Sequence, residues 1–254
     1  LQPMSEPAGA PWREISATMK KLRARRYDAV IDTQGLLRTG ILAKLMHGTR
    51  HGYDKASIRE SLAARFYDVR HTVSRALHAI ERNRLLTGRA LGYEPEGPID
   101  YGLDRSRLAS ARNGPYAVLL HATARPEKEW PEDRLIEVAA NLTKRGLEIV
   151  LPWGNAVERE RSARIAAALP RSRIPERQPL DALARIIAGA AVVVGVDTGL
   201  LHLAAALGVP LVAVFVGSEP GLTGPRGGGR IEILGAKGAP PTAAAVIAAI
   251  ERIA

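Results

Sequence analysis

The stretch VVVGVDTGLLHLAAALGVPLVAVFVGSEPG, residues 192 to 221, decides the fold. Val192 to Val196 are all apolar or glycine, as in a strand that is buried on both faces of a parallel sheet. After the turn Asp197-Thr198-Gly199, leucine and alanine recur at helical spacing until Gly208 and Pro210, and a second apolar run follows. The stretch therefore predicts a strand, a short helix and a second strand over residues 211 to 216.

The turn after the first of these strands lies where parallel sheets bind ligands. Ligands bind beyond the carboxyl ends of the strands, where the next helix presents free N–H groups and the positive end of its dipole. Gly199 lets a bulky anion approach the backbone, Thr198 adds a hydroxyl, and His202 lies one turn along on the same face as Thr198. The arrangement suits a diphosphate. In the alternative interpretation, Asp197 only caps the helix and His202 only packs.

Strand and helix patterns alternate on both sides of this stretch, which predicts an α/β protein with doubly wound parallel sheets. The second half has strand patterns at 116–120, 147–151 and 231–234, and helical patterns at 132–145, 158–168, 180–188 and 242–253. The polar segment from Gly92 to Gly114, with its prolines, is typical of a linker. We therefore expect an N-terminal domain at 1–105, a C-terminal domain at 114–240 and a C-terminal helix at 241–254.

The first domain carries fewer strand signals. We expect helices at 12–26, 36–46, 57–67 and 76–91, one buried strand at 27–32, and a loop or edge strand at 47–54. One good strand and one weak strand are too few for a covered sheet of the usual size. Either this domain is unusual or its beginning is missing from the chain.

Composition limits the class of protein. The chain has 254 residues, 46% of them apolar and 24% charged, which is enough for one large or two modest domains. It has no cysteine, which excludes disulfides and thiolate metal sites and makes a reducing compartment the simplest expectation. No apolar run reaches the roughly 18 residues of a membrane span, and the first residues lack the pattern of a signal peptide. We expect a cytoplasmic protein.

The positive charge is concentrated in the first third. The net charge is +10, and residues 13–89 hold 17 Lys and Arg against 7 Asp and Glu. Such a field attracts nucleic acid, an anionic membrane surface, or a phosphorylated and carboxylated substrate. Nucleic acid is disfavoured because only two Phe and six Tyr are present to stack on bases and no reader motif appears. The alternative is a solvated, arginine-rich surface.

Five segments occur together in the order seen in one family. They are DTQGLLRTG (32–40), HGYDKASIRESLAARFY (51–67), HATARPEKEWP (121–131), LPWGN (151–155) and VDTGLLHLAAALGVP (196–210). From about residue 12 to its end, the chain resembles the lipopolysaccharide heptosyltransferase I family. The stretch from HGYD to RE favours type I over type II.

The resemblance implies a GT-B glycosyltransferase with two Rossmann-like domains that face a cleft, the first of them incomplete here. It implies transfer of L-glycero-D-manno-heptose from ADP-heptose to Kdo2-lipid A in lipopolysaccharide inner-core biosynthesis. The reaction would invert the anomeric centre and need no metal and no cofactor. The expected place is the cytoplasmic face of the inner membrane, where the protein would bind peripherally to an anionic surface. No nucleic-acid partner is expected.

The resemblance also implies where the donor binds, namely in the second domain. Lys128 would neutralise the leaving diphosphate, and Glu158 would contact the nucleoside end. Without the resemblance, Lys128 is a surface lysine and Glu158 an ordinary acid in the first turn of a helix. The residues expected at the donor site are Thr123, Lys128, Glu158, Asp197, Thr198, Gly199 and His202.

For the acceptor, whose phosphates and carboxylates are negatively charged, the basic first domain is the matching surface. Arg59 is the first candidate, and Arg65, Arg70 and Arg75 lie nearby in the sequence, although each is equally explained as an exposed structural charge. Gln34 and Gly35 follow a strand and are expected to line the cleft.

Three departures from the family pattern matter. The family's proposed base is an aspartate in an N-terminal Gly-Asp loop, and no residue here matches it; Asp32 is the nearest carboxylate, and we expect it not to be the base. Ala124 stands where a second hydroxyl is usual, and VFVGSEPG (214–221) departs from FG-x-TDPG. We therefore expect donor binding with weak transfer. The alternatives are a noncatalytic nucleotide-binding remnant and a heptosyltransferase II-type activity.

Overall fold

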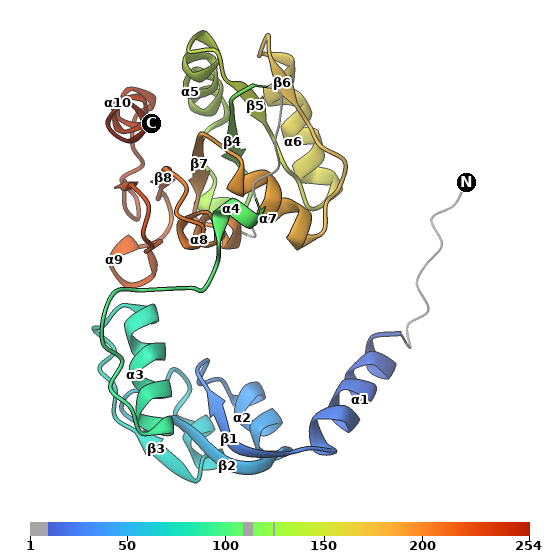
Figure 1. The fold of residues 1–254 in the computed structure, drawn as a ribbon, viewed down its shortest axis with the longest axis vertical. Coiled ribbons are helices and arrows are strands. Elements are labelled where there is room, and N and C mark those ends of the chain that lie inside the picture. Colours follow the sequence, from blue (N-terminus) through green and yellow to red (C-terminus); the bar gives the residue numbers. More distant parts are fainter. Residues whose placement is uncertain (1–9, 109–113, 124) are drawn as a thin grey trace. The chain divides into compact units, whose positions relative to one another are not determined.

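A computed structural model of the protein describes residues 10–108, 114–123 and 125–254 (Figure 1). The chain divides into two compact units, with the boundary between Gly97 and Pro98. This boundary falls inside the segment that the sequence predicts as a linker. On the first side, Arg84 donates to the carbonyl of Glu96 at 2.9 Å; on the second, Arg105 donates to the carbonyl of Ala188 at 2.7 Å. Each unit therefore fixes its own end of the connecting segment.

The first unit is built on three parallel strands in the order β1-β2-β3. The sequence expectation for residues 47–54 is wrong, because they form the central strand rather than a loop or an edge. Two glycines and several polar side chains hide its apolar pattern, but the backbone pairs on both sides. The elements are α1 (Ala10–Arg23), β1 (Arg26–Asp32), α2 (Leu37–Lys44), β2 (His47–Tyr53), the 3-10 helix η1 (Ser61–Phe66), β3 (Val69–His71) and α3 (Ala79–Leu91).

The two faces of this small sheet are covered by different elements. Residue 52 must be glycine, because the ring of Tyr67, just after η1, packs directly on its backbone and leaves no room for a side chain. The next residue, Tyr53, points to the other face and donates to Asn83 of α3 at 3.0 Å. The helix expected at 57–67 is shorter than predicted, since the Asp54 carboxylate accepts the Ser57 N–H at 2.8 Å and turns the chain. The strand β3 was not expected at all.

The second unit contains a six-stranded parallel sheet in the order β6-β5-β4-β7-β8-β9. The strand predicted at 192–196 is confirmed as β7, with β4 and β8 on either side. The elements are α4 (Arg105–Leu108), β4 (Tyr116–Leu120), the 3-10 helix η2 (Pro126–Lys128), α5 (Glu132–Lys144), β5 (Glu148–Val150), α6 (Ala156–Ala167), β6 (Ser172–Arg173), α7 (Leu180–Ala188), β7 (Val192–Val196), α8 (Gly199–Ala206), β8 (Leu211–Val214), α9 (Pro220–Thr223), β9 (Ile231–Leu234) and α10 (Ala243–Ile253).

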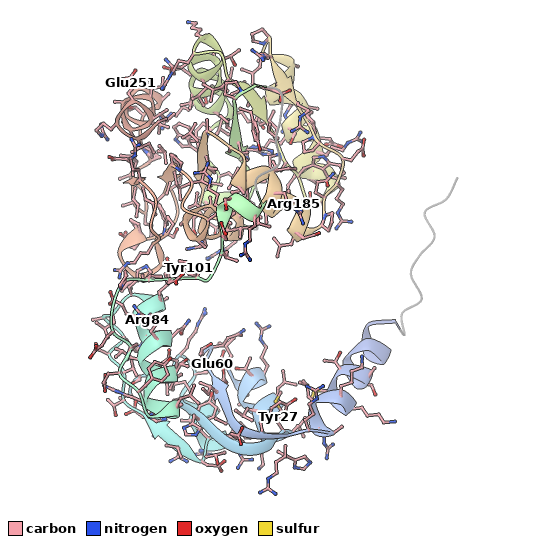
Figure 2. All side chains as sticks on the ribbon, in the orientation of Figure 1. Tyr27, Glu60, Arg84, Tyr101, Arg185 and Glu251 are labelled. Carbon is pink, nitrogen blue, oxygen red and sulfur yellow. The ribbon has the colours of Figure 1, made fainter. Side chains whose placement is uncertain are left out.

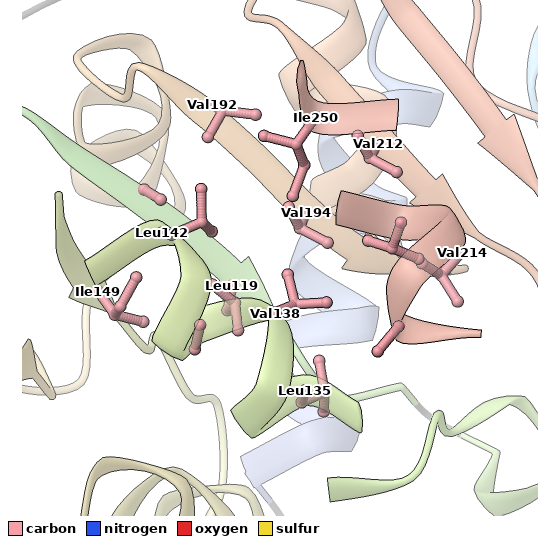
Figure 3. Packing of buried hydrophobic residues seen from close by; sticks show 14 of the residues in the cluster. Leu119, Leu135, Val138, Leu142, Ile149, Val192, Val194, Val212, Val214 and Ile250 are labelled. Atoms are coloured by element: carbon pink, nitrogen blue, oxygen red, sulfur yellow. The ribbon is translucent and has the colours of Figure 1, made fainter. Parts of the chain in front are cut away.

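Alternate residues of the central strands enter two separate apolar cores. On one face, Leu119 and Val194 pack with Val138 of α5 and Ile250 of α10 (Figure 3). On the other face, the intervening strand residues pack against α7 and α8. Each fully buried Leu, Val or Ile contributes about 1.5–3 kcal/mol to folding. This double-sided burial holds the ends of β4, β7 and β8 in fixed register.

Within residues 10–108, 114–123 and 125–254, no helix is long and apolar enough to cross a membrane.

Candidate functional site

Side chains from three loops lie in contact at the edge of the second sheet where its strands end, and two of them bind the same carboxylate oxygen of the third. Lys128 follows β4, Asp197 follows β7 and Ser218 follows β8, and these strands are neighbours. Lys128 Nζ lies 2.5 Å and Ser218 Oγ 2.6 Å from Asp197 Oδ2. The Lys128 and Asp197 side chains are only 13% and 12% exposed. Asp197 therefore joins segments that are far apart in the sequence.

Asp197 is ionised and His202 is neutral near pH 7. Burial raises the pKa of the Asp197 carboxyl, but the hydrogen bonds from Lys128 and Ser218 outweigh burial and bring this pKa below its ordinary value. Burial lowers the pKa of His202; Asp197 opposes this effect and Lys128 adds to it. An ion pair and an uncharged imidazole thus lie together beside the start of α8.

The alternative in which Asp197 only caps α8 is not what the structure shows. Asp197 uses its carboxylate on Lys128 and Ser218, and the residue at the N-cap position is Thr198. The side chain of Thr198 makes no capping hydrogen bond to α8. A Cβ added at Gly199 would meet no described heavy atom within 4 Å. The N-terminus of α8 is therefore open to a ligand.

A cavity of about 440 Å³ lies beside this cluster. Thr123 and Thr198 line it, and the Thr123 hydroxyl donates to the Asp197 carbonyl at 3.1 Å, which links the cavity to the ion pair. The wall combines flat and apolar side chains with polar ones, a composition suited to a nucleoside with phosphates. The lining residues other than these two are Leu120, His121, Ala122, Pro152, Trp153, Gly154, Asn155, Glu158, Arg177, Gln178, Leu183 and Leu200.

Glu158 lines this cavity, but it also closes the start of α6. Its Oε2 accepts the Gly154 N–H at 2.7 Å, and its Oε1 accepts from Asn155 Nδ2 at 2.8 Å. In return, Asn155 Oδ1 accepts the Glu158 N–H at 3.0 Å. This is a reciprocal cap of the kind formed at helix starts. The same carboxylate therefore orders the loop that forms one wall of the cavity.

His121 ties the end of β4 to α6, a role that the sequence analysis did not predict. The side chain is fully buried, and Nε2 lies 2.8 Å from Ser162 Oγ. Burial lowers the pKa of His121 to about 4, and the positive charge of Arg161 contributes. A neutral histidine at a strand end leaves no charge signal in a sequence, so only its position in the HATARPEKEWP segment pointed to it.

In the first unit, the Asp32 carboxylate accepts hydrogen bonds from four groups of the same unit. Its Oδ1 accepts the N–H groups of Gln34 at 2.9 Å and Gly35 at 3.2 Å. Its Oδ2 accepts from Thr39 at 2.7 Å and from Tyr67 at 2.6 Å. Asp32 is buried, and it holds the turn after β1 in place.

The other first-unit candidates lie in several segments: Gln34 and Gly35 after β1, Arg59 before η1, Arg65 in η1, Arg70 in β3 and Arg75 after β3. Gln34 and Arg59 are exposed, whereas Gly35 is buried with a φ of +64°, a value that suits glycine. Glu60, labelled in Figure 2, accepts the Leu37 N–H at 2.6 Å and so ties the segment before η1 to the start of α2. Arg65, Arg70 and Arg75 are all exposed, and Arg70 also donates to the Ala64 carbonyl at 2.8 Å. Ala124 lies outside the described residues.

Ser218 donates to Asp197, and Trp153 and Arg177 line the cavity, although the sequence analysis did not single them out. The only advance signal for Ser218 was that residues 214–221 depart from the family pattern. Trp153 lay in a recognised segment without an assigned role, and Arg177 lay in an unremarkable polar stretch.

Comparisons with known proteins agree on one group. The model of glycosyltransferase family 9 (heptosyltransferase) matches residues 15–245. Lipopolysaccharide heptosyltransferase 1 of Pseudomonas aeruginosa is 44% identical over 225 residues, which cover 87% of this chain and 62% of that protein. The solved structure of E. coli heptosyltransferase WaaC with ADP has a TM-score of 0.87 at 39% identity, over 96% of this chain and 79% of that one. The WaaC structure with ADP-2-deoxy-2-fluoro heptose has a TM-score of 0.83 at 39% identity, over 96% and 78%.

Proposed function

We propose, from the premise that this chain belongs to glycosyltransferase family 9 (heptosyltransferase), that it acts as a lipopolysaccharide heptosyltransferase of type 1. It would move a heptosyl group from ADP-heptose to Kdo2-lipid A during inner-core synthesis. The chain spans 62% of the length of the Pseudomonas relative.

One observation carries the proposal. The open N-terminus of α8, the threonine-lined cavity and the Lys128–Asp197 pair lie together at the carboxyl edge of the second sheet. A nucleoside diphosphate needs a flat-walled pocket for its base, N–H donors for its phosphates and a cation for the charge that develops on departure. The second unit provides all three. The donor named in one related structure, an ADP-heptose analogue, has this chemistry.

Within this proposal each donor-site residue has a distinct task. Thr198 and the N–H group of Gly199 hydrogen-bond the phosphates, and neutral His202 donates to them without adding charge. The Thr123 hydroxyl turns from the Asp197 carbonyl to a phosphate oxygen when the ligand binds. Lys128 moves from Asp197 toward the diphosphate as the bond to the sugar breaks. Glu158 accepts from the nucleoside hydroxyls with the lone pairs that its helix cap leaves free.

The reaction is an inverting displacement. An acceptor hydroxyl oxygen forms the new bond to the anomeric carbon, the bond from that carbon to the phosphate oxygen breaks, and ADP leaves with the electron pair. The hydroxyl proton passes to a solvent water molecule as the new bond forms. Asp32 is not suited to this task, because four donors already use its two oxygens. Water therefore takes the place of a side-chain base, and neither a metal nor a cofactor takes part.

On the acceptor side, the positive charge of the first unit favours a negatively charged lipid substrate. Exposed Arg59, together with Arg65 and Arg75, would contact its phosphates and carboxylates, and Gln34 and Gly35 would line the approach. The same charge favours peripheral binding to the anionic cytoplasmic face of the inner membrane. Vesicles that contain phosphatidylglycerol should co-sediment with the protein, and phosphatidylcholine vesicles should not.

The decisive test has a binding arm and a transfer arm. Calorimetry should detect ADP and ADP-heptose, and a duplex oligonucleotide is the control ligand. Radiolabelled heptose should then appear on Kdo2-lipid A. ADP binding without transfer would support a nucleotide-binding remnant, and heptose appearing only on an acceptor that already carries one heptose would support type 2 activity. Salt-dependent oligonucleotide binding without ADP binding would overturn the proposal.

A further inference from the structure

We propose that Ser218 is a positioning residue of the donor site. Its hydroxyl and the Lys128 ammonium group donate to the same oxygen of Asp197, and this shared bonding lets Lys128 move from Asp197 to the diphosphate. This inference rests on the proposed function, because it assumes that an anionic nucleotide binds beside Lys128. It concerns the turn after β8, which supplies none of the residues expected at the site from the sequence.

The geometry brings two donors to one acceptor atom. Ser218 Oγ lies 2.6 Å and Lys128 Nζ 2.5 Å from Asp197 Oδ2. The serine comes from the turn after β8 and the lysine from the loop after β4, so neither is a sequence neighbour of Asp197. The position of the carboxylate is therefore set by Ser218 as well as by its own strand.

The residue before Ser218 holds the same two loops together. A Cβ added at Gly217 would lie 2.4 Å from the Glu127 carbonyl oxygen and 3.3 Å from Lys128 Cγ. Only a residue without a side chain fits against this backbone. Gly217 therefore keeps the β8 turn in contact with the Lys128 loop, and Ser218 reaches Asp197 from that fixed point.

Ser218 affects ligand binding through the negative charge of Asp197. The Lys128–Asp197 pair is mostly buried, so the diphosphate must draw Lys128 away from a carboxylate that holds it strongly. The Ser218 hydrogen bond spreads the negative charge of Asp197 and remains in place when the lysine moves. Without the hydroxyl, the carboxylate would hold Lys128 more tightly, repel the phosphates more and be less fixed in orientation. All three changes weaken nucleotide binding.

The test measures ADP affinity by calorimetry in five forms of the full chain. These are the wild type, Ser218→Ala, Ser218→Thr, Asp197→Ala and the double variant of Asp197→Ala with Ser218→Ala. We expect Ser218→Ala to weaken ADP binding about 3- to 10-fold, the range of one ordinary hydrogen bond. Ser218→Thr, which keeps the hydroxyl, should stay within about twofold of wild type. With Asp197 replaced, Ser218→Ala should change the affinity by less than about twofold, because the two act as a unit.

A matched control separates this role from a general packing role. Ser172 on β6 donates to the Ala166 carbonyl at 3.3 Å at the far edge of the same sheet, and Ser172→Ala should leave ADP affinity unchanged. Equal losses from Ser218→Ala with and without Asp197 would overturn the inference, as would no loss at all. Failure of the wild type to bind ADP would remove the proposed function first and this inference with it.

Discussion

Two turns with similar sequences have different partners in the two units. Asp32-Thr33-Gln34-Gly35 follows β1 and Asp197-Thr198-Gly199 follows β7, and each leads into a helix of 8 residues. Asp32 accepts from four donors within its own unit and closes its turn. The Asp197 carboxylate instead accepts from Lys128 and Ser218, which come from other loops.

The difference teaches that a carboxylate at a strand end is defined by its partners rather than by its motif. Burial is nearly complete for Asp32, which is 7% exposed, and Tyr67 covers it. Burial, together with the hydrogen bond to Asp32, raises the pKa of the Tyr67 hydroxyl, so this donor stays protonated. Asp197 lies beside a cavity and holds a cation that a ligand can use. One turn stabilises its unit, and we propose that the other supports binding.

The largest expected effect separates folding from binding. Asp32→Ala removes the acceptor of four hydrogen bonds and leaves the buried Tyr67 hydroxyl without its partner, so the first unit should lose about 3–5 kcal/mol of stability. ADP binding by the second unit should persist. Limited proteolysis and thermal unfolding, followed by calorimetry, would measure both. A loss of ADP affinity with an intact first unit would contradict the contrast drawn between the two aspartates.

The second prediction concerns the charge on Asp197. Lys128→Ala removes a cation and leaves a bare carboxylate beside the phosphates, so ADP affinity should fall by about 1.5–3 kcal/mol, or roughly 10- to 150-fold. Removing Asp197 as well should recover part of the loss, because the repulsion disappears. Calorimetry on both variants would show this, with Lys144→Ala as the exposed control. A double variant that binds no better than the single one would sink the idea that Asp197 opposes the anion.

The third prediction concerns how stability depends on pH through His121, the buried histidine at the end of β4. The folded-state pKa of His121 is about 4, lowered from 6.5, so the unfolded chain binds the proton more readily. Stability from this group is complete above pH 6.5 and should fall as the pH drops toward 4, by at most about 1.4 kcal/mol per pH unit. Urea unfolding between these pH values would measure the slope. His121→Gln should flatten it, and an unchanged slope would assign the effect to other groups.

The smallest effect compares the two turn glycines. At Gly35 a Cβ would lie 2.7 Å from Ile58 Cγ1 with φ at +64°, so Gly35→Ala should destabilise the first unit by about 1–2 kcal/mol. At Gly199 the added Cβ meets nothing described, and alanine should stabilise α8 by about 0.5–1 kcal/mol. Yet Gly199→Ala should weaken ADP binding, since the ligand needs that open surface. Equal ADP affinity with a stabilised α8 would show that the phosphates do not approach there.

Much of the second unit was predictable because its core strands are continuous apolar runs. The strand at 192–196, the helix after it and the strand beginning at Leu211 were all confirmed. The first unit was harder, because β2 carries two glycines and β3 has only 3 residues. In both strands the parallel backbone pairing, rather than side-chain pattern, makes the structure.

By itself the sequence determined the alternating α/β order, the buried strand before Asp197, and the family to which the five segments point. Only the tertiary structure decided which aspartate closes a turn and which holds a lysine, and it alone brought Ser218 to the same oxygen. The reason is that periodicity reports how each residue meets its own strand or helix. Contacts among the ends of β4, β7 and β8 depend instead on the order of strands in the sheet, which brings together residues about 20 to 70 positions apart.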